Sequence, residues 1–360
     1  MGIIDYLYYV RRAIFRRGMP LHLTLFVTKK CNCRCRHCFF WKEINKDEKE
    51  FSLADIRNLS KSMGRLLLLN ISGGEPFLRK DLPEILHEFY KNNKTRHFAI
   101  PTNGLLSQQT VDSTKHILRL CPDAAIVVYV SLDGLQRVHD NIRGVKGTFK
   151  KAVSTFYALK ELKKEFKNLD VGTLTTLTGY NQKEFPKLYD YITRKMKPDM
   201  AYLNIVRGSP KNEGAKAVSI KSYRKACEII EKDIRKGDIA NKGFFLSPFA
   251  NAVNILAHKL NLETFGKKKC LIRCLAGNLS GVVYSNGMVY PCELLNMPIG
   301  NLNQTGYDLR KLWLSKKAEE IQKQITDKKC FCTHECVMNI NLIFNLRFWP
   351  KIIYEGVRLF

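Results

Sequence analysis

The sequence predicts an α/β protein, a partial (β/α)6 TIM-like barrel followed by a small cysteine-rich domain. Short β-branched or leucine-rich runs alternate with helical patterns six times before about residue 245. The alternation then stops, and six of the twelve cysteines lie in the remaining segment. Repeated β/α units form a parallel sheet covered by helices, and right-handed crossovers curl such a sheet toward a barrel.

The predicted units follow one another along the chain. Each strand is a short apolar run, as expected where both faces of a parallel sheet are buried, and each helix has apolar residues three and four apart. The strand and helix pairs are 22–28 with 53–63, 66–72 with 81–92, 97–101 with 111–120, 124–131 with 149–166, 169–178 with 184–195, and 200–206 with 223–235. The loops after the strand ends are expected to carry the chemistry.

A hairpin is predicted in the cysteine-rich region. Two apolar runs, 279–284 and 288–291, are separated by Ser-Asn-Gly, and Asn-Gly is a strong turn signal. The predicted organisation is an N-terminal amphipathic helix, a core domain, a cysteine-rich domain and an aromatic-basic end, with bounds at 1–20, 21–240, 241–340 and 341–360.

The charge balance is strongly basic. Lys and Arg number 60 against 33 Asp and Glu, a formal net charge of +27, which favours an anionic partner. The basic residues recur on many helices rather than in one stripe, and no nucleic-acid-binding module is recognisable, so nucleic acid is not the expected partner.

The composition also bears on location. A chain that is 45% hydrophobic and 26% charged is neither disordered nor a polytopic membrane protein. The first residues do not resemble a signal peptide, and no run reaches eighteen apolar residues. A cytoplasmic, reducing location is expected, where clustered cysteines are more often metal ligands than disulfides.

The first cysteine cluster directly follows the first predicted strand. Cys31, Cys35 and Cys38 have three and then two residues between them. Three thiolates on one short loop can hold three irons of a cubane 4Fe–4S cluster and leave the fourth iron open. The alternative is structural zinc, which needs a fourth protein ligand that Cys33 or His37 could supply.

This loop, its strand and residues 72–76 (Ser-Gly-Gly-Glu-Pro) resemble the radical S-adenosylmethionine (SAM) superfamily. Residues 102–104 (Thr-Asn-Gly) and 131–134 (Ser-Leu-Asp-Gly), the latter continued by 139–144, resemble the subfamily with SPASM or twitch extensions. The resemblance runs from about residue 21 to 336. It implies a barrel of the radical SAM type with a C-terminal twitch/SPASM-like domain.

The resemblance also implies a cofactor set. Cys31, Cys35 and Cys38 would hold a 4Fe–4S cluster whose open iron binds SAM, and one electron would release a 5′-deoxyadenosyl radical. Gly73 and Gly74 would let backbone approach the ligand closely, and the guanidinium of an arginine suits a carboxylate. The residues expected at SAM are His37, Gly73, Gly74, Glu75, Asn103, Ser131, Asp133 and Arg143. His37 stands where the family usually has an aromatic residue.

The second cysteine group resembles the opening of the SPASM/twitch pattern. It implies an auxiliary 4Fe–4S cluster held by Cys274, Cys292, Cys332 and Cys336, with Cys330 as the alternative to Cys332. The two-five-three spacing of a full SPASM domain is absent, so one auxiliary cluster is predicted rather than two. Zinc is again the alternative, because tetrahedral thiolate suits both metals.

The predicted function is that of a radical SAM enzyme that abstracts hydrogen from a peptide or protein substrate, with a reductant such as flavodoxin or ferredoxin. A lipid or lipid-linked substrate is the alternative, because aromatic-basic amphipathic segments at both ends suit peripheral binding to an anionic membrane surface, unless both segments pack on the barrel. A second alternative is a non-catalytic iron–sulfur or zinc protein, which would not cleave SAM.

Overall fold

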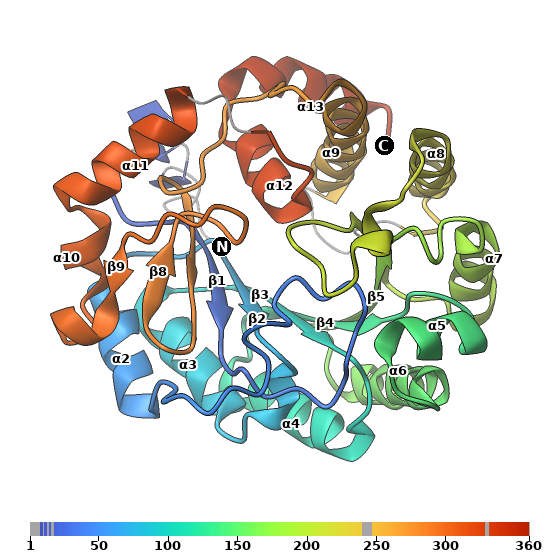
Figure 1. Cartoon of the computed structure of the whole chain (residues 1–360), viewed down its shortest axis with the longest axis horizontal. Coiled ribbons are helices and arrows are strands. Elements are labelled where there is room, and N and C mark those ends of the chain that lie inside the picture. The colour runs from blue at the N-terminus through green and yellow to red at the C-terminus, as the bar shows by residue number, and fades with distance from the viewer. Residues whose placement is uncertain are drawn as a thin grey trace.

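The computed structural model describes residues 8–9, 11–12, 14–15, 18–239, 247–327 and 331–359, and shows a curved sheet wrapped by helices (Figure 1). Within these residues the sheet has nine strands in the order β6-β5-β4-β3-β2-β1-β7-β8-β9, and β1 to β6 are parallel. The strands are β1 (His22–Phe26), β2 (Leu68–Ser72), β3 (His97–Thr102), β4 (Ala125–Ser131), β5 (Leu169–Leu177), β6 (Met200–Ile205), β7 (Ser280–Val283), β8 (Met288–Tyr290) and β9 (Gly300–Asn301).

Helices connect and cover the parallel strands, as the predicted partial barrel requires (Figure 1). They are α2 (Leu53–Ser62), α3 (Leu82–Asn93), α4 (Ser107–Leu120), α5 (Gln136–Arg143), α6 (Thr148–Glu165), α7 (Phe185–Asp190) with the π-helical η2 (Tyr191–Met196), and α8 (Ile220–Lys236). Short 3-10 turns are η1 (Pro76–Leu78), η3 (Glu213–Lys216), η4 (Leu302–Thr305) and η5 (Leu346–Phe348). Helix α5 was not predicted, because its eight residues are too few for a periodic pattern.

The strands present different side chains on their two faces. Alternate residues such as Leu69, Ile71, Val128 and Val130 belong to the main hydrophobic core between the sheet and its covering helices. The residues between them are often polar, and in β1 and β2 the Nδ2 atom of Asn70 lies 2.9 Å from Nε2 of His22. Both faces of β1 are buried as expected, and the inner face carries polar residues such as His22.

The predicted hairpin is confirmed, and it continues the core sheet. β7 pairs in parallel with β1, and β8 pairs antiparallel with β7 across the Asn286–Gly287 turn. Gly287 has φ +88°, a conformation that favours glycine. The cysteine loop follows β1, and β1 lies between β2 and β7. The start of the cysteine loop is therefore close to the C-terminal region.

Five further helices complete the described C-terminal half: α9 (Ser247–Lys267), α10 (Leu309–Trp313), α11 (Lys316–Asp327), α12 (Glu335–Ile343) and α13 (Trp349–Val357). Helices α8, α12 and α13 all pack on α9 (Figure 1). α9 was missed because buried residues occur on all its sides and hide the helical period.

Three sequence predictions fall partly or wholly outside the described residues. Of the N-terminal helix expected over 1–20, only 8–9, 11–12 and 14–15 are described as helical. Cys330 and the side chain of Cys336 are not described either. Among the helices that are described, none has the length and apolar content needed to span a bilayer.

Candidate functional site

A cavity of about 430 Å³ opens at the carboxyl ends of the parallel strands. Its lining gathers residues that are far apart in the sequence but follow neighbouring strands. From the predicted site it contains Cys31, Cys35, His37, Cys38, Gly73, Gly74, Glu75, Asn103, Ser131 and Arg143. This volume lies in the usual range for small-molecule sites.

The cysteine loop is held at both ends by hydrogen bonds. The backbone N–H of Cys31 donates to Oδ1 of Asn45 at 2.8 Å, and Nδ2 of Asn45 donates to the Cys31 carbonyl at 3.0 Å. Farther along, the backbone N–H of Arg34 donates to the carbonyl of Arg143 at 3.0 Å. The thiol positions are therefore set by Asn45 on one side and by the end of α5 on the other.

The three cluster-type thiols differ in acidity. Burial raises the pKa of Cys31 to about 11 and that of Cys38 to about 12. A hydrogen bond from the Cys33 thiol, aided by Arg143, lowers the pKa of Cys35 to about 5. Nη1 of Arg143 lies 3.8 Å from Sγ of Cys35. Cys35 is thus the thiol whose thiolate, the metal-binding form, is best stabilised by its protein surroundings.

A buried ion pair supports Arg143. Its Nη2 atom lies 2.6 Å from Oδ2 of Asp133, and Asp133 also accepts a 2.9 Å hydrogen bond from the Thr176 backbone. Burial opposes the charge of Asp133, but Arg143 and then His37 still hold its pKa below the usual range. Asp133 is not among the cavity-lining residues, so it acts on the cavity through Arg143.

Glu75 is buried at the end of β2 and is bound by the end of β3. Its carboxylate accepts hydrogen bonds from the Thr102 hydroxyl at 2.9 Å and from the Asn103 backbone at 2.7 Å. Burial nevertheless raises its pKa to about 7. The side chain of Asn103 donates at 2.7 Å to Oδ1 of Asn32, which joins the β3 end to the cysteine loop.

Gly73 and Gly74 also have a role in packing that the sequence did not predict. A Cβ on Gly73 would lie 2.3 Å from the carbonyl oxygen of Thr28, and one on Gly74 would lie 2.1 Å from that of Lys30. The glycines therefore allow the backbone before Cys31 to pack directly on the end of β2. Both residues also line the cavity, but a side chain at either position would already collide with the backbone of Thr28 or Lys30 before any ligand is considered.

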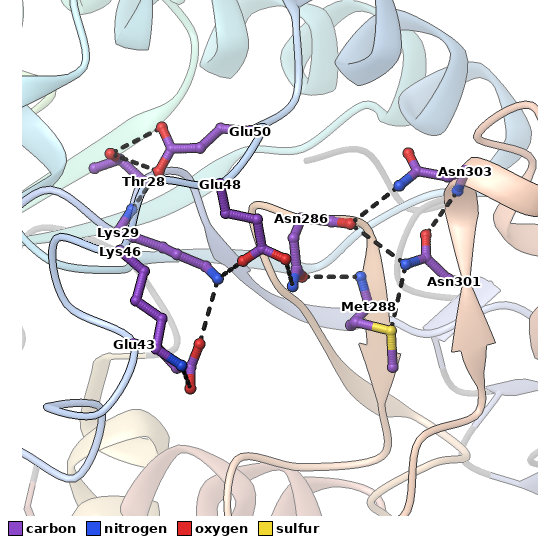
Figure 2. A network of polar contacts seen from close by, with 10 residues as sticks. All are labelled: Thr28, Lys29, Glu43, Lys46, Glu48, Glu50, Asn286, Met288, Asn301 and Asn303. Carbon is purple, nitrogen blue, oxygen red and sulfur yellow. Dashed lines mark hydrogen bonds and ion pairs between the residues drawn. The ribbon is translucent and has the colours of Figure 1, made fainter.

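Lys29 is the centre of a polar network that the sequence did not predict (Figure 2). Its ammonium group is almost fully buried and pairs with Glu48 and, at 3.4 Å, with Glu43. Glu48 also accepts a 3.1 Å hydrogen bond from Asn286 at the tip of the β7–β8 hairpin. The network thus connects the start of the cysteine loop with the C-terminal region.

A second buried network brings the C-terminal cysteines near the cavity. Glu293 lies 2.6 Å from Nη2 of Arg207, which lines the cavity, and 3.2 Å from Nε2 of His334. Arg207 and His334 outweigh burial and hold the pKa of Glu293 well below its usual range. Cys292 precedes Glu293, and His334 stands two residues from both Cys332 and Cys336.

The residue after Cys274 is hydrogen-bonded to α12. The backbone N–H of Leu275 donates to Oδ1 of Asn341 in α12 at 2.8 Å, and α12 also contains Cys336. The segment of Cys274 therefore contacts the second half of α12, and Cys332 and Cys336 lie just before and at the start of the same helix. In the part of the chain that is described, no three His, Cys, Asp or Glu residues form a group that could hold one metal ion. A cubane differs, because each thiolate binds a separate iron.

Two family models match this chain. The model of the radical SAM superfamily matches residues 25–192, and that of the SPASM iron–sulfur cluster-binding domain matches residues 274–337. The first begins within β1 and covers the cysteine loop and β2 to β5, and the second begins at Cys274 and includes the hairpin and Cys336.

Curated relatives and a solved structure are also similar. The chain is 29% identical over 251 residues to Fe-coproporphyrin III synthase of Methanosarcina barkeri (63% of this chain, 57% of that protein). It is 31% identical over 150 residues to the subtilosin biosynthesis protein AlbA of Bacillus subtilis (40% and 31%). The structure of Streptococcus suis SuiB bound to precursor peptide SuiA shares the fold, with a TM-score of 0.62, 16% identity, and coverage of 89% and 70%. The chain thus spans little more than half the length of the first relative and less of the second.

Proposed function

This chain belongs to the radical SAM superfamily and carries a SPASM iron–sulfur domain, and on that premise we propose that it abstracts hydrogen from a peptide or protein substrate after reductive cleavage of SAM. The family confirms the predicted cofactor classes, a 4Fe–4S cluster with SAM and auxiliary iron–sulfur. The observation that carries the proposal is the shared cavity, which is lined by the three thiols, Arg143 and the glycine-glutamate stretch.

Cys31, Cys35 and Cys38 are proposed to hold the first cluster. The donor set fits it, because three thiols from one loop line a single cavity and Arg143 stabilises the thiolate of Cys35. When bound, the cluster supplies the single electron that splits the sulfonium of SAM. The chain's own contribution is to place the thiols: the side chain of Asn45 and the backbone of Arg143 are hydrogen-bonded to the backbone of the cysteine loop.

Arg143 and Glu75 are proposed to hold the two charged ends of the amino acid part of SAM. Arg143 is buried and oriented by Asp133, so its guanidinium is placed to bind a carboxylate. Glu75 is a buried carboxylate with a raised pKa, so a cationic amine beside it would offset its desolvation. Ser131 and His37 line the same cavity and are proposed to contact the nucleoside.

The C-terminal cysteines are proposed to hold one auxiliary cluster. Cys274, Cys292, Cys332 and Cys336 are the proposed ligands, and Glu293 with Arg207 connects their surroundings to the cavity. The expected change is a loss of iron in Cys292→Ala while the first cluster remains. Equal iron content in wild type and variant would contradict this assignment.

The proposed substrate class is based on two relatives and on the composition of the C-terminal segment. A peptide is supported by AlbA, named for biosynthesis of a bacteriocin, and by the SuiB fold relative that was solved with a precursor peptide. A lipid-linked substrate is supported by the basic, aromatic C-terminal segment. The excess of Lys and Arg would steer either an acidic substrate or an acidic reductant such as flavodoxin or ferredoxin.

The test uses anaerobically reconstituted full-length protein with dithionite and SAM. Release of 5′-deoxyadenosine is expected, and Cys35→Ala should abolish it while Cys227→Ala, a buried cysteine of α8, should not. Deuterium transfer from labelled candidate substrates to 5′-deoxyadenosine then separates the classes: precursor peptides, isoprenoid lipids, or iron porphyrin precursors, because the first relative is named as a synthase of Fe-coproporphyrin III. Transfer only from the lipid or the porphyrin would overturn the peptide assignment.

A further inference from the structure

The C-terminal end of the chain carries an exposed apolar surface. Five large apolar side chains are between one-third and two-thirds exposed, and we call them the C-terminal stripe: Ile343, Leu346, Ile353, Tyr354 and Val357. Ile343 ends α12, Leu346 lies in η5, and the other three lie in α13. Within α13, Val357 is four residues from Ile353 and three from Tyr354, so these three side chains share one side of that helix.

Helix α13 has two apolar faces, and only one is covered. Ile352 and Gly356 are buried, and Gly356 lies so close to Phe249 of α9 that a Cβ there would meet its ring at 2.7 Å. At 100° per residue, Tyr354 lies opposite this packed face, and Ile353 and Val357 lie on the flank between the two. The stripe is therefore not core, since α9 already fills the other side of the helix.

The charges around the stripe have one sign. Arg347, Lys351 and Arg358 are exposed, and two of them lie over aromatic rings, with Lys351 5.7 Å from the Phe348 ring centre and Arg358 5.4 Å from that of Tyr354. Between residues 343 and 359 the sequence contains one acidic residue, Glu355. Glu355 faces the body of the protein, where it pairs with Arg235 at 2.8 Å.

We propose that the C-terminal stripe and its three basic residues bind the surface of an anionic lipid bilayer. An interfacial helix inserts an apolar face at the headgroup boundary and surrounds it with Lys and Arg, and this arrangement occurs here on a helix fixed to the protein. Tyr354 is suited to the headgroup level, because its ring is apolar and its hydroxyl polar. The long stems of Lys351 and Arg358 let their charges reach phosphates while the stripe is buried.

The expected affinity is moderate and depends on salt. α13 has nine residues, so the apolar contact is small, and each basic residue near an anionic surface adds about a fivefold gain in partitioning. The surface attaches the enzyme peripherally and requires nothing of the substrate, so SAM cleavage without vesicles should be unaffected.

The test is flotation of reconstituted full-length protein with vesicles of phosphatidylcholine alone or with 30% phosphatidylglycerol, at low and high salt. Binding to the anionic vesicles and release by salt are expected. Lys351→Glu/Arg358→Glu should lower partitioning at least tenfold, and Ile353→Ser/Val357→Ser should lower it by the same factor at every salt concentration at which the wild type still binds. Lys150→Glu/Lys151→Glu on α6 changes the net charge equally and serves as the matched control.

Three results would overturn the proposal. If the control on α6 weakens vesicle binding as much as Lys351→Glu/Arg358→Glu does, net charge alone is responsible. Wild-type protein that stays at the bottom of the gradient at low salt would exclude the bilayer. A concentration-dependent dimer that Val357→Asp dissociates would assign the stripe to a second copy of the chain. Unchanged release of 5′-deoxyadenosine by each variant confirms that the protein is folded, and it keeps this test separate from that of the proposed activity.

Discussion

Replacing Gly74 by alanine should disable the site without touching a thiol. The new Cβ would lie 2.1 Å from the carbonyl oxygen of Lys30, whereas ordinary contacts begin at 3.4 Å. The neighbour is backbone, so no side chain can rotate away, and the segment leading into Cys31 must move by more than an ångström. Overpacking of this kind costs about 1–3 kcal/mol in stability, and a displacement of about 1 Å at a reacting centre can cost ~10²-fold in rate.

The assay compares iron content and 5′-deoxyadenosine release in Gly74→Ala and Gly64→Ala. Gly64 also has a φ that other residues adopt, but the nearest atom to its Cβ would be 3.7 Å away, so this variant should behave as wild type. Gly74→Ala should lose about two orders of magnitude in release, more than its loss of iron explains. Wild-type iron and a rate within threefold of wild type would refute the idea that this close packing positions the cysteine loop.

Three further predictions concern other parts of the molecule. Arg143→Lys keeps the charge but loses the two-pronged guanidinium that reaches Asp133 and Cys35, so the KM for SAM should rise about tenfold or more in initial-rate measurements; an unchanged KM would count against a carboxylate contact. Asn45→Ala removes two hydrogen bonds to the Cys31 backbone and should lower iron retention during gel filtration, whereas retention like that of wild type would show that the loop does not need them. Burial lowers the pKa of His258 from 6.5 to about 4. Between these pH values the histidine is protonated in the unfolded chain but neutral in the folded one, so the free energy of unfolding falls as the pH drops from about 6.5 to 4. His258 should contribute about 2 kcal/mol to the stability lost by pH 5 in urea unfolding, and His258→Gln should reduce the loss by that amount, while the pKa values of His22 and His139, also lowered by burial, keep part of the dependence; parallel curves for the two proteins would contradict it.

The sequence predicted the six β/α units and the cofactor classes because both depend on local information. Cys31, Cys35 and Cys38 share one loop, and Gly73 to Glu75 follow the next strand, so the parallel topology alone brings them to one edge. The C-terminal hairpin was likewise marked by its Asn-Gly turn.

The contacts that support these residues could not be predicted, because they join distant segments. Lys29 pairs with Glu48, and Glu48 pairs with Asn286, which lies 238 residues farther along the chain (Figure 2). No periodic pattern in the sequence indicates these contacts. Glu293 was overlooked for the same reason, since its partners Arg207 and His334 lie in different elements. Asn45 has a φ of +59°, which Asn tolerates better than most residues. The sequence does not reveal this conformation, so the role of Asn45 could not be predicted.

The central claim is that three thiolates leave one iron of the first cluster for SAM. Electron–nuclear double resonance on the reduced, oxygen-free protein tests it directly, with ¹⁵N in the amino group of SAM. We expect a hyperfine coupling from that nitrogen to the cluster, which is lost in Cys35→Ala but kept in Cys292→Ala. A cluster without such a coupling, or zinc bound by four protein ligands at the cysteine loop, would contradict the account.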